Sequence, residues 1–212
     1  MDTLPGQRCE GGLPARPPLE LHGRVSRRTA LWVLGALLGC AGAPRGAPVS
    51  TLEAPACAGT IAAAPEGTRP VDDPTLLASA LGAAGAGKLC AGAVFEATRP
   101  LTLYRVWQRD RAYTELGRWW TFERPEGPRD RYRGQNVICP EWSALDAWSR
   151  CELRAGARFV LGPGQSARCE GGLTLPVSPT NQVYIDNDAR AQRVFVERCE
   201  PLGAWPEASV AP

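Results

Sequence analysis

The chain of 212 residues is poor in several side chains on which much enzyme chemistry depends. It has one histidine, His22, and one lysine, Lys88. Because no histidine follows residue 22, the rest of the chain cannot build a Ser-His-Asp or Cys-His nucleophile, nor an imidazole metal site. No two of the eight cysteines have CxxC spacing, so the sequence predicts no zinc or other metal centre.

The charge of the chain is close to balanced. The first 39 residues carry five of the 24 basic and three of the 22 acidic residues, which leaves 19 of each. A net charge near zero argues against nucleic acid or an anionic membrane surface as the main partner. Apart from Lys88 the cationic residues are arginines, whose planar guanidinium suits bidentate recognition of phosphate.

Residues 26–40 have the order of an export signal. Paired arginines precede an apolar run over 30–38, which is too short to span a bilayer as a permanent helix. The end of the run, 37–40, resembles the lipobox of bacterial lipoproteins, and the paired arginines resemble the twin-arginine signal. We expect an exported protein with lipid on Cys40, held in the cell envelope at the outer membrane or cell surface because Ala41 is not an aspartate. The alternative is a buried hydrophobic helix with an unrelated cysteine.

Six cysteines follow the proposed lipid-attachment site. An even number in an exported chain predicts three disulfides, with 15 connectivities that the sequence does not distinguish. Free buried thiols are the alternative. The six are Cys57, Cys90, Cys139, Cys151, Cys169 and Cys199.

Composition divides the chain into three parts. We expect an export signal over 1–39, a flexible tether rich in Ala, Pro and Gly over 40–70, and one globular domain over 71–212. The domain opens with a helix expected over 73–89, which Asp73 can cap.

The remainder of the domain is dominated by strand patterns. A helical turn is expected within 143–151, and the sequence 162–164, Gly-Pro-Gly, predicts a turn. The sum is a small α+β domain rich in antiparallel sheet and stapled by disulfides. Strands are expected over 101–107, 117–122, 157–161, 181–185 and 193–197.

Four segments within residues 100–187 follow one another in an order that resembles a known family. They are 103–107 (LYRVW), 117–120 (GRWW), 151–156 with 162–166, and 181–184 (NQVY). This order resembles the domain of tuberculosis necrotizing toxin and of secreted fungal NAD glycohydrolases. The resemblance implies an ADP-ribosyltransferase-like fold and hydrolysis of NAD to nicotinamide and ADP-ribose, with NAD as substrate and no cofactor.

The resemblance assigns the phosphate contacts to arginine. Arg105 would hold the pyrophosphate, although an ion pair with Glu115 or Glu123 is an alternative use of its charge. Arg131 or Arg133 would add a second contact, unless these arginines form only a solvated charged surface.

The same resemblance assigns the nicotinamide and ribose contacts. Trp119 and Trp120 would line the nicotinamide pocket, although one of two adjacent aromatic residues is normally in the core. Gln182 would act on the ribose or on water, or be simply an exposed strand residue. Gln165 would bind substrate after a glycine turn at 162–164 that admits the ligand close to the backbone, or that is only a hairpin turn.

The chemistry needs few reactive groups. Loss of nicotinamide from NAD passes through an oxocarbenium-like state, as glycoside hydrolysis does, but its leaving group departs neutral without a general acid. A site can therefore catalyse this reaction by positioning the substrate and water, without an activated nucleophile.

Two other functions stay open. Transfer of ADP-ribose to a protein is one, although no Glu-x-Glu or Gln-x-Glu motif is present at Gln182. The other is a non-enzymatic, disulfide-stabilised binding lipoprotein with tryptophans in a core or an interaction surface, namely Trp107, Trp119, Trp120, Trp142 and Trp148. The sequence identifies neither an immunity partner nor another surface partner. If Arg105 and Gln182 do not face one cleft, the enzyme hypothesis fails.

Overall fold

The computed structural model describes residues 57–205. The expected export signal, Cys40 and the first part of the expected tether lie outside the described residues. Within 57–205, no helix is long and apolar enough to cross a membrane.

The described chain forms a small sheet-rich domain with two α-helices. In chain order the elements are β1 (Thr68–Pro70), α1 (Pro74–Ala80), β2 (Ala93–Ala97), β3 (Leu101–Trp107), η1 (Ala112–Thr114), β4 (Trp119–Trp120), α2 (Arg129–Gln135), β5 (Ala147–Leu153), β6 (Arg158–Gly164), β7 (Ala167–Arg168), η2 (Glu170–Gly172), β8 (Thr174–Leu175), β9 (Ser178–Tyr184) and β10 (Val196–Ala204).

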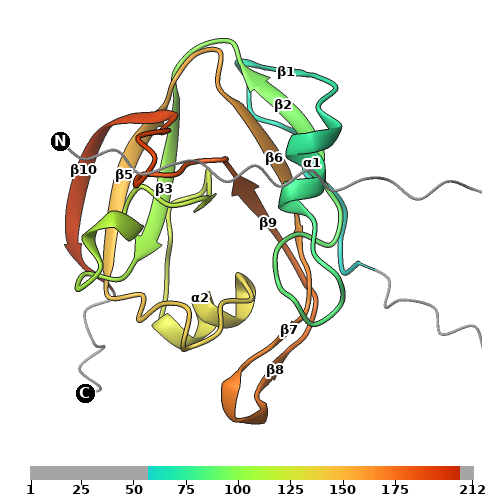
Figure 1. Cartoon of the computed structure of the whole chain (residues 1–212), viewed down its shortest axis with the longest axis vertical. Coiled ribbons are helices and arrows are strands. Elements are labelled where there is room, and N and C mark those ends of the chain that lie inside the picture. The colour runs from blue at the N-terminus through green and yellow to red at the C-terminus, as the bar shows by residue number, and fades with distance from the viewer. Residues whose placement is uncertain (1–56, 206–212) are drawn as a thin grey trace, which may run out of the picture. The chain divides into compact units, whose positions relative to one another are not determined.

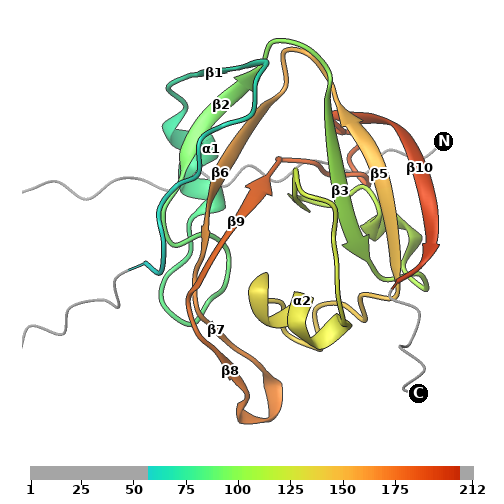
Figure 2. The ribbon, with the colours of Figure 1, turned by 180° about the vertical axis from the view of Figure 1, so that it is seen from behind.

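These strands form two main antiparallel sheets. One has the order β1-β2-β6-β9-β4 and the other β10-β5-β3, and β7 and β8 form a separate hairpin. Figures 1 and 2 show the two sheets inclined toward each other at one end, with α2 between them at the other. The expectation of a small, antiparallel, sheet-rich domain is confirmed.

The short strand β4 connects the two sheets. Trp119 on β4 pairs with Tyr184 on β9. One residue after β4, the Thr121 amide donates to the Tyr104 carbonyl on β3 (2.9 Å), and the Tyr104 amide donates to the Thr121 carbonyl (2.8 Å). The middle of β3 is therefore held close to β9, although the two strands belong to different sheets.

The main core fills the space between the sheets. Leu103 on β3, Phe159 on β6 and Val183 on β9 are fully buried in one apolar cluster. Phe95 and Phe122 pack on Phe159, with ring centroids 5.7 and 5.4 Å away. Both sheets contribute to this apolar cluster, and its burial stabilises their packing against each other.

The six cysteines form three disulfides, as expected. The pairs are Cys57–Cys90, Cys139–Cys169 and Cys151–Cys199. The first pair attaches Cys57, which lies within the expected tether of 40–70, to the domain. Residues 57–70 also contribute β1, and the Ala62 amide donates to Asn181 Oδ1 (3.0 Å). The domain thus extends to Cys57 within the described chain.

The two helical segments expected from the sequence, 73–89 and 143–151, both differ from the structure. Asp73 does cap α1, accepting from the Leu76 amide (3.0 Å), but the helix ends at Ala80. Three glycines within the next seven residues explain the early end, because glycine favours the unfolded chain over a helix. The helical turn expected over 143–151 is wrong, since β5 occupies Ala147–Leu153.

The turn expected at 162–164 is also wrong, because β6 runs through to Gly164. A Cβ on Gly162 would lie 1.9 Å from the Ala91 carbonyl oxygen, so no side chain fits between β6 and the 91–92 segment. Pro163 is tolerated because the β6–β9 register shifts directly after it, where a missing donor costs little. The glycines therefore mark close packing.

Candidate functional site

A cavity of about 280 Å³ lies where β3, β4 and β9 approach the segment that follows α2. It brings together residues far apart in the chain. Its lining is Lys88, Arg105, Val106, Trp119, Asn136, Val137, Ile138, Trp142, Ser143, Leu145 and Gln182. Arg105 and Gln182 thus share one cavity, and the condition that would have ended the enzyme hypothesis is not met.

Gln182 places a buried amide on this cavity. The residue is only 6% exposed, and its side chain forms no hydrogen bond within residues 57–205. It stands opposite Gly162 in the β6–β9 register, and a Cβ on Gly164 would lie 2.8 Å from its Nε2 atom. The glycines of β6 therefore leave room for an amide whose donors and acceptor are all free to bind a ligand.

Arg105 is fixed by backbone carbonyls. Its Nε donates to the Thr114 carbonyl (2.6 Å), and its Nη1 donates to the Trp119 carbonyl. Its Nη2 packs against Gly117, where a Cβ would lie 2.3 Å away, and has no hydrogen-bond partner in the described chain. Burial lowers the pKa of Arg105 to about 10, so the guanidinium remains cationic at neutral pH.

The ion pair considered for Arg105 does not form. Within the described chain neither Glu115 nor Glu123 lies within 4.0 Å of its nitrogens. Glu115 instead accepts from the Ser149 hydroxyl (2.5 Å).

The two adjacent tryptophans have different places. Trp119 lines the cavity, and its ring packs edge-on against Tyr184 with centroids 5.0 Å apart. Trp120 is buried in the main core, where its Nε1 donates to the Gly117 carbonyl (2.8 Å). Strand alternation accounts for this split, because successive side chains point to opposite faces.

Positive φ angles occur at three non-glycine positions in the cavity wall. They are Lys88 (67°), Val137 (50°) and Leu145 (53°). This conformation is unfavourable for a β-branched residue such as Val137 and is typical of functional sites.

Arg133 supports this wall from behind. Its Nη1 donates to the Ile138 carbonyl and its Nη2 to the Ser143 carbonyl, each at 3.0 Å. Burial is the main cause that lowers its pKa. Arg133 does not line the cavity, so it acts as a positioning residue for the loop that does.

Two further residues expected at the site lie elsewhere. Arg131 is exposed and borders a separate recess beside Glu123 and Arg124. Gln165 is buried but does not line the cavity. Its Oε1 accepts from the Ser166 amide (2.8 Å), which commits the side chain to the local fold.

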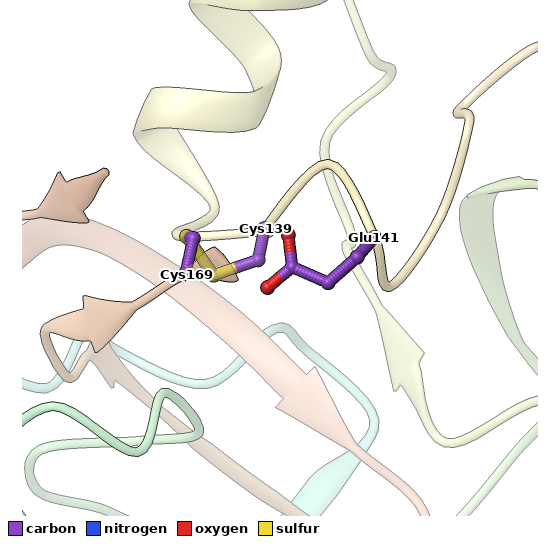
Figure 3. Close-up of side chains that lie close together, drawn as sticks. All are labelled: Cys139, Glu141 and Cys169. Carbon is purple, nitrogen blue, oxygen red and sulfur yellow. A yellow bond between two sulfur atoms is a disulfide. The ribbon is translucent and has the colours of Figure 1, made fainter. Parts of the chain in front are cut away.

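Cys139, Glu141 and Cys169 also lie together, close to the cavity wall (Figure 3). The two sulfur atoms are joined in a disulfide, so neither is a thiolate that can bind a metal ion. The Glu141 carboxylate accepts from the Glu170 amide (2.9 Å).

Most of the tryptophans considered as an interaction surface are in the interior. Trp107, Trp120 and Trp148 are buried. Trp142 is 46% exposed at the cavity, so it is the one of these residues that could contact a large partner.

Asn136 and Lys88 line the cavity although the sequence pattern did not assign them to a site, and Trp142, expected only in a core or an interaction surface, also lines it. Asn136 follows a run of charged residues, which gives no sign that the chain turns back there into the interior.

A search for protein families, for similar curated proteins and for similar solved structures finds no match to this chain.

Proposed function

We propose that this domain binds NAD and hydrolyses the bond between nicotinamide and ribose. The observation that carries the proposal is the cavity itself. Arg105, Trp119 and Gln182 come from β3, β4 and β9, and all three line it. The ADP-ribosyltransferase-like fold is part of the same proposal, supported by two inclined antiparallel sheets with a cavity where β3, β4 and β9 approach the segment after α2.

The volume of the cavity sets which part of NAD it would take. Ligand pockets typically measure about 300–1,000 Å³. A cavity of about 280 Å³ would hold the nicotinamide and its ribose but not a whole dinucleotide. Arg105 also borders an outer recess of about 590 Å³, so a pyrophosphate at its guanidinium would leave the adenosine in that recess.

Each lining group has a chemical task in this scheme. Trp119 would stack on or beside the nicotinamide ring. The free Nη2 of Arg105 would donate to a phosphate oxygen, a charge-assisted bond. The Gln182 carbonyl oxygen would carry its partial negative charge toward the ribosyl cation or orient the attacking water, contacts that strengthen as the cation develops.

Water is the acceptor that this lining favours. No carboxylate lines the cavity within residues 57–205. The site therefore offers neither a nucleophile for a glycosyl-ester intermediate nor a base to activate a protein side chain. Hydrolysis by positioned water needs neither group.

The test is nicotinamide release from a fluorescent NAD analogue by the oxidised domain. Gln182→Met keeps the length of the side chain but removes its hydrogen bonds, and should lower turnover by about 10²–10³-fold. Gln192→Ala is the matched control, because Gln192 is an exposed glutamine that does not line the cavity. Absence of both NAD cleavage and NAD binding by wild type would leave the non-enzymatic function.

We also propose that the protein is an exported lipoprotein. Three disulfides fit an extracellular, oxidising environment. Attachment of lipid at Cys40 would hold the domain at the membrane surface by residues that precede Cys57.

A further inference from the structure

Asn136 is a second buried amide at the cavity, and its orientation is determined by its position at the end of α2. The residue is 8% exposed and lines the cavity. It is the C-cap of α2, and its Nδ2 donates to the Tyr132 carbonyl (3.0 Å). A carbonyl can only accept, so the amide nitrogen must face Tyr132, which takes one of its two hydrogens, and the oxygen Oδ1 is left as a free acceptor.

Gln182 completes a complementary set of groups. Its amide has no partner within the described chain and offers both a donor, Nε2, and an acceptor, Oε1. Together the two side chains present two acceptor oxygens, and Nε2 of Gln182 and the second hydrogen of Asn136 Nδ2 are the donors. A carboxamide carries the converse set, since its NH₂ donates twice and its carbonyl accepts.

We infer that Asn136, with Gln182, determines specificity by selecting a ligand that carries a neutral carboxamide over the same ligand carrying a carboxylate. This inference rests on the proposed function and names the group that the nicotinamide end must carry. A carboxylate has no hydrogen to give, so Oδ1 of Asn136 would face a negatively charged oxygen and would receive no hydrogen bond from it. Buried acceptors left unpaired in this way are costly, which is why such sites reject analogues strongly.

The cations of the cavity do not reverse this preference. Arg105 gives its Nε and Nη1 to the Thr114 and Trp119 carbonyls. Lys88 is exposed, and its Nζ donates to the Ser79 carbonyl (3.1 Å). In the proposed complex the charge of Arg105 is opposite the pyrophosphate, so it does not compensate a carboxylate on the ring.

The test measures binding of free nicotinamide and of free nicotinic acid to the oxidised domain by ligand-observed NMR, with inorganic pyrophosphate present in both measurements so that the charge of Arg105 is occupied as in the proposed complex. We expect nicotinamide to bind more tightly by about tenfold or more. Asn136→Ala should reduce that ratio to near one, and Gln182→Met should weaken nicotinamide more than nicotinic acid. Gln135→Ala is the matched control, because Gln135 is the adjacent amide residue, is exposed and does not line the cavity.

Equal binding of the two fragments, tighter binding of the acid, or no binding of nicotinamide by wild type would overturn the inference. The wild-type comparison holds even if the Asn136 variant does not fold. Failure of the inference can be separated from failure of the proposed function. Selectivity for the amide without cleavage of NAD would support the role of Asn136 and refute the proposed enzymatic activity. Equal cleavage of NAD and its nicotinic acid analogue would support the enzymatic activity and refute the role of Asn136.

Discussion

Arg105 on β3 donates a hydrogen bond to the main-chain carbonyl of Trp119 on β4. Because β4 pairs with β9, this contact ties a buried cation in one sheet to the strand that carries Gln182 in the other. The same guanidinium holds the Thr114 carbonyl. Arg105 thus has a structural role whatever ligand it binds, and a loss of activity in Arg105→Ala would not by itself identify a phosphate contact.

Gly164 provides a sharper test of the Gln182 position. A Cβ there would lie 2.8 Å from Gln182 Nε2 and 3.1 Å from Val137 Cγ2. Gly164→Ala should therefore displace the amide and lower kcat/KM for NAD by tenfold or more, about 1.4 kcal/mol of transition-state stabilisation.

Gly134→Ala is the matched control for that substitution. Gly134 lies in α2, and no atom lies within 4 Å of an added Cβ. Alanine there should stabilise the helix by about 0.5–1 kcal/mol without changing kinetics. A Gly164→Ala enzyme with wild-type kcat/KM would show that the position of the Gln182 amide is unimportant.

The Cys139–Cys169 disulfide should matter for the cavity as well as for stability. Cys139 directly follows Val137 and Ile138, which line the cavity. Replacing both cysteines by alanine should lower the free energy of unfolding by about 2–4 kcal/mol and raise KM for NAD. Urea denaturation and steady-state kinetics measure the two effects.

The Cys151–Cys199 disulfide is the comparison. It joins β5 to β10, and neither cysteine lines the cavity. Its removal should lower the free energy of unfolding by a similar amount and leave the KM for NAD unchanged. An equal change of KM in both double variants would contradict the link between Cys139 and the cavity wall.

The pH profile of NAD hydrolysis should be nearly flat around neutrality. The cavity lining contains no histidine, cysteine or carboxylate within the described chain, and these are the groups that most often titrate between about pH 4 and pH 9. Burial lowers the pKa of Arg105 to about 10, so its charge is present below that pH and is lost as the pH rises through it. We expect kcat/KM to fall only on the alkaline side. A profile that falls below pH 7 while the protein stays folded would require an acidic or imidazole group, and within residues 57–205 the lining of the cavity that holds Gln182 has neither.

Lipid attachment predicts where the protein is found. Cys40→Ala should move the protein from the membrane fraction to the soluble fraction of the envelope, because the acyl chains supply the membrane affinity. Metabolic labelling with a fatty acid should mark the wild type alone. A wild type without label whose membrane association does not depend on Cys40 would exclude the lipoprotein hypothesis.

Local sequence signals predicted the elements that depend on local physics. Alternation predicted β3 correctly at both ends, and the Asp73 cap predicted the start of α1. The helix α2 was missed because it buries only Tyr132, so the charged segment 129–135 has no apolar stripe. The Gly-Pro-Gly stretch was misassigned as a turn because its glycines are required by close packing against Ala91 and Gln182, which lie far away in the chain.

The candidate site could be predicted only in part for a similar reason. Arg105, Trp119 and Gln182 were placed together by the order of segments, and the cavity contains all three. Asn136 gains its role from a helix C-cap and from the approach of β9, and neither is visible in a local pattern. The disulfide connectivity likewise depends on tertiary proximity.

The most direct test of the central claim is proton NMR of NAD incubated with the oxidised domain. We predict that the resonances of NAD decrease while those of free nicotinamide and of ADP-ribose appear in equal amounts, and that Gln182→Met slows this conversion while Gln192→Ala does not. NAD that stays intact with folded wild-type protein, or cleavage at full rate by Gln182→Met, would contradict the account.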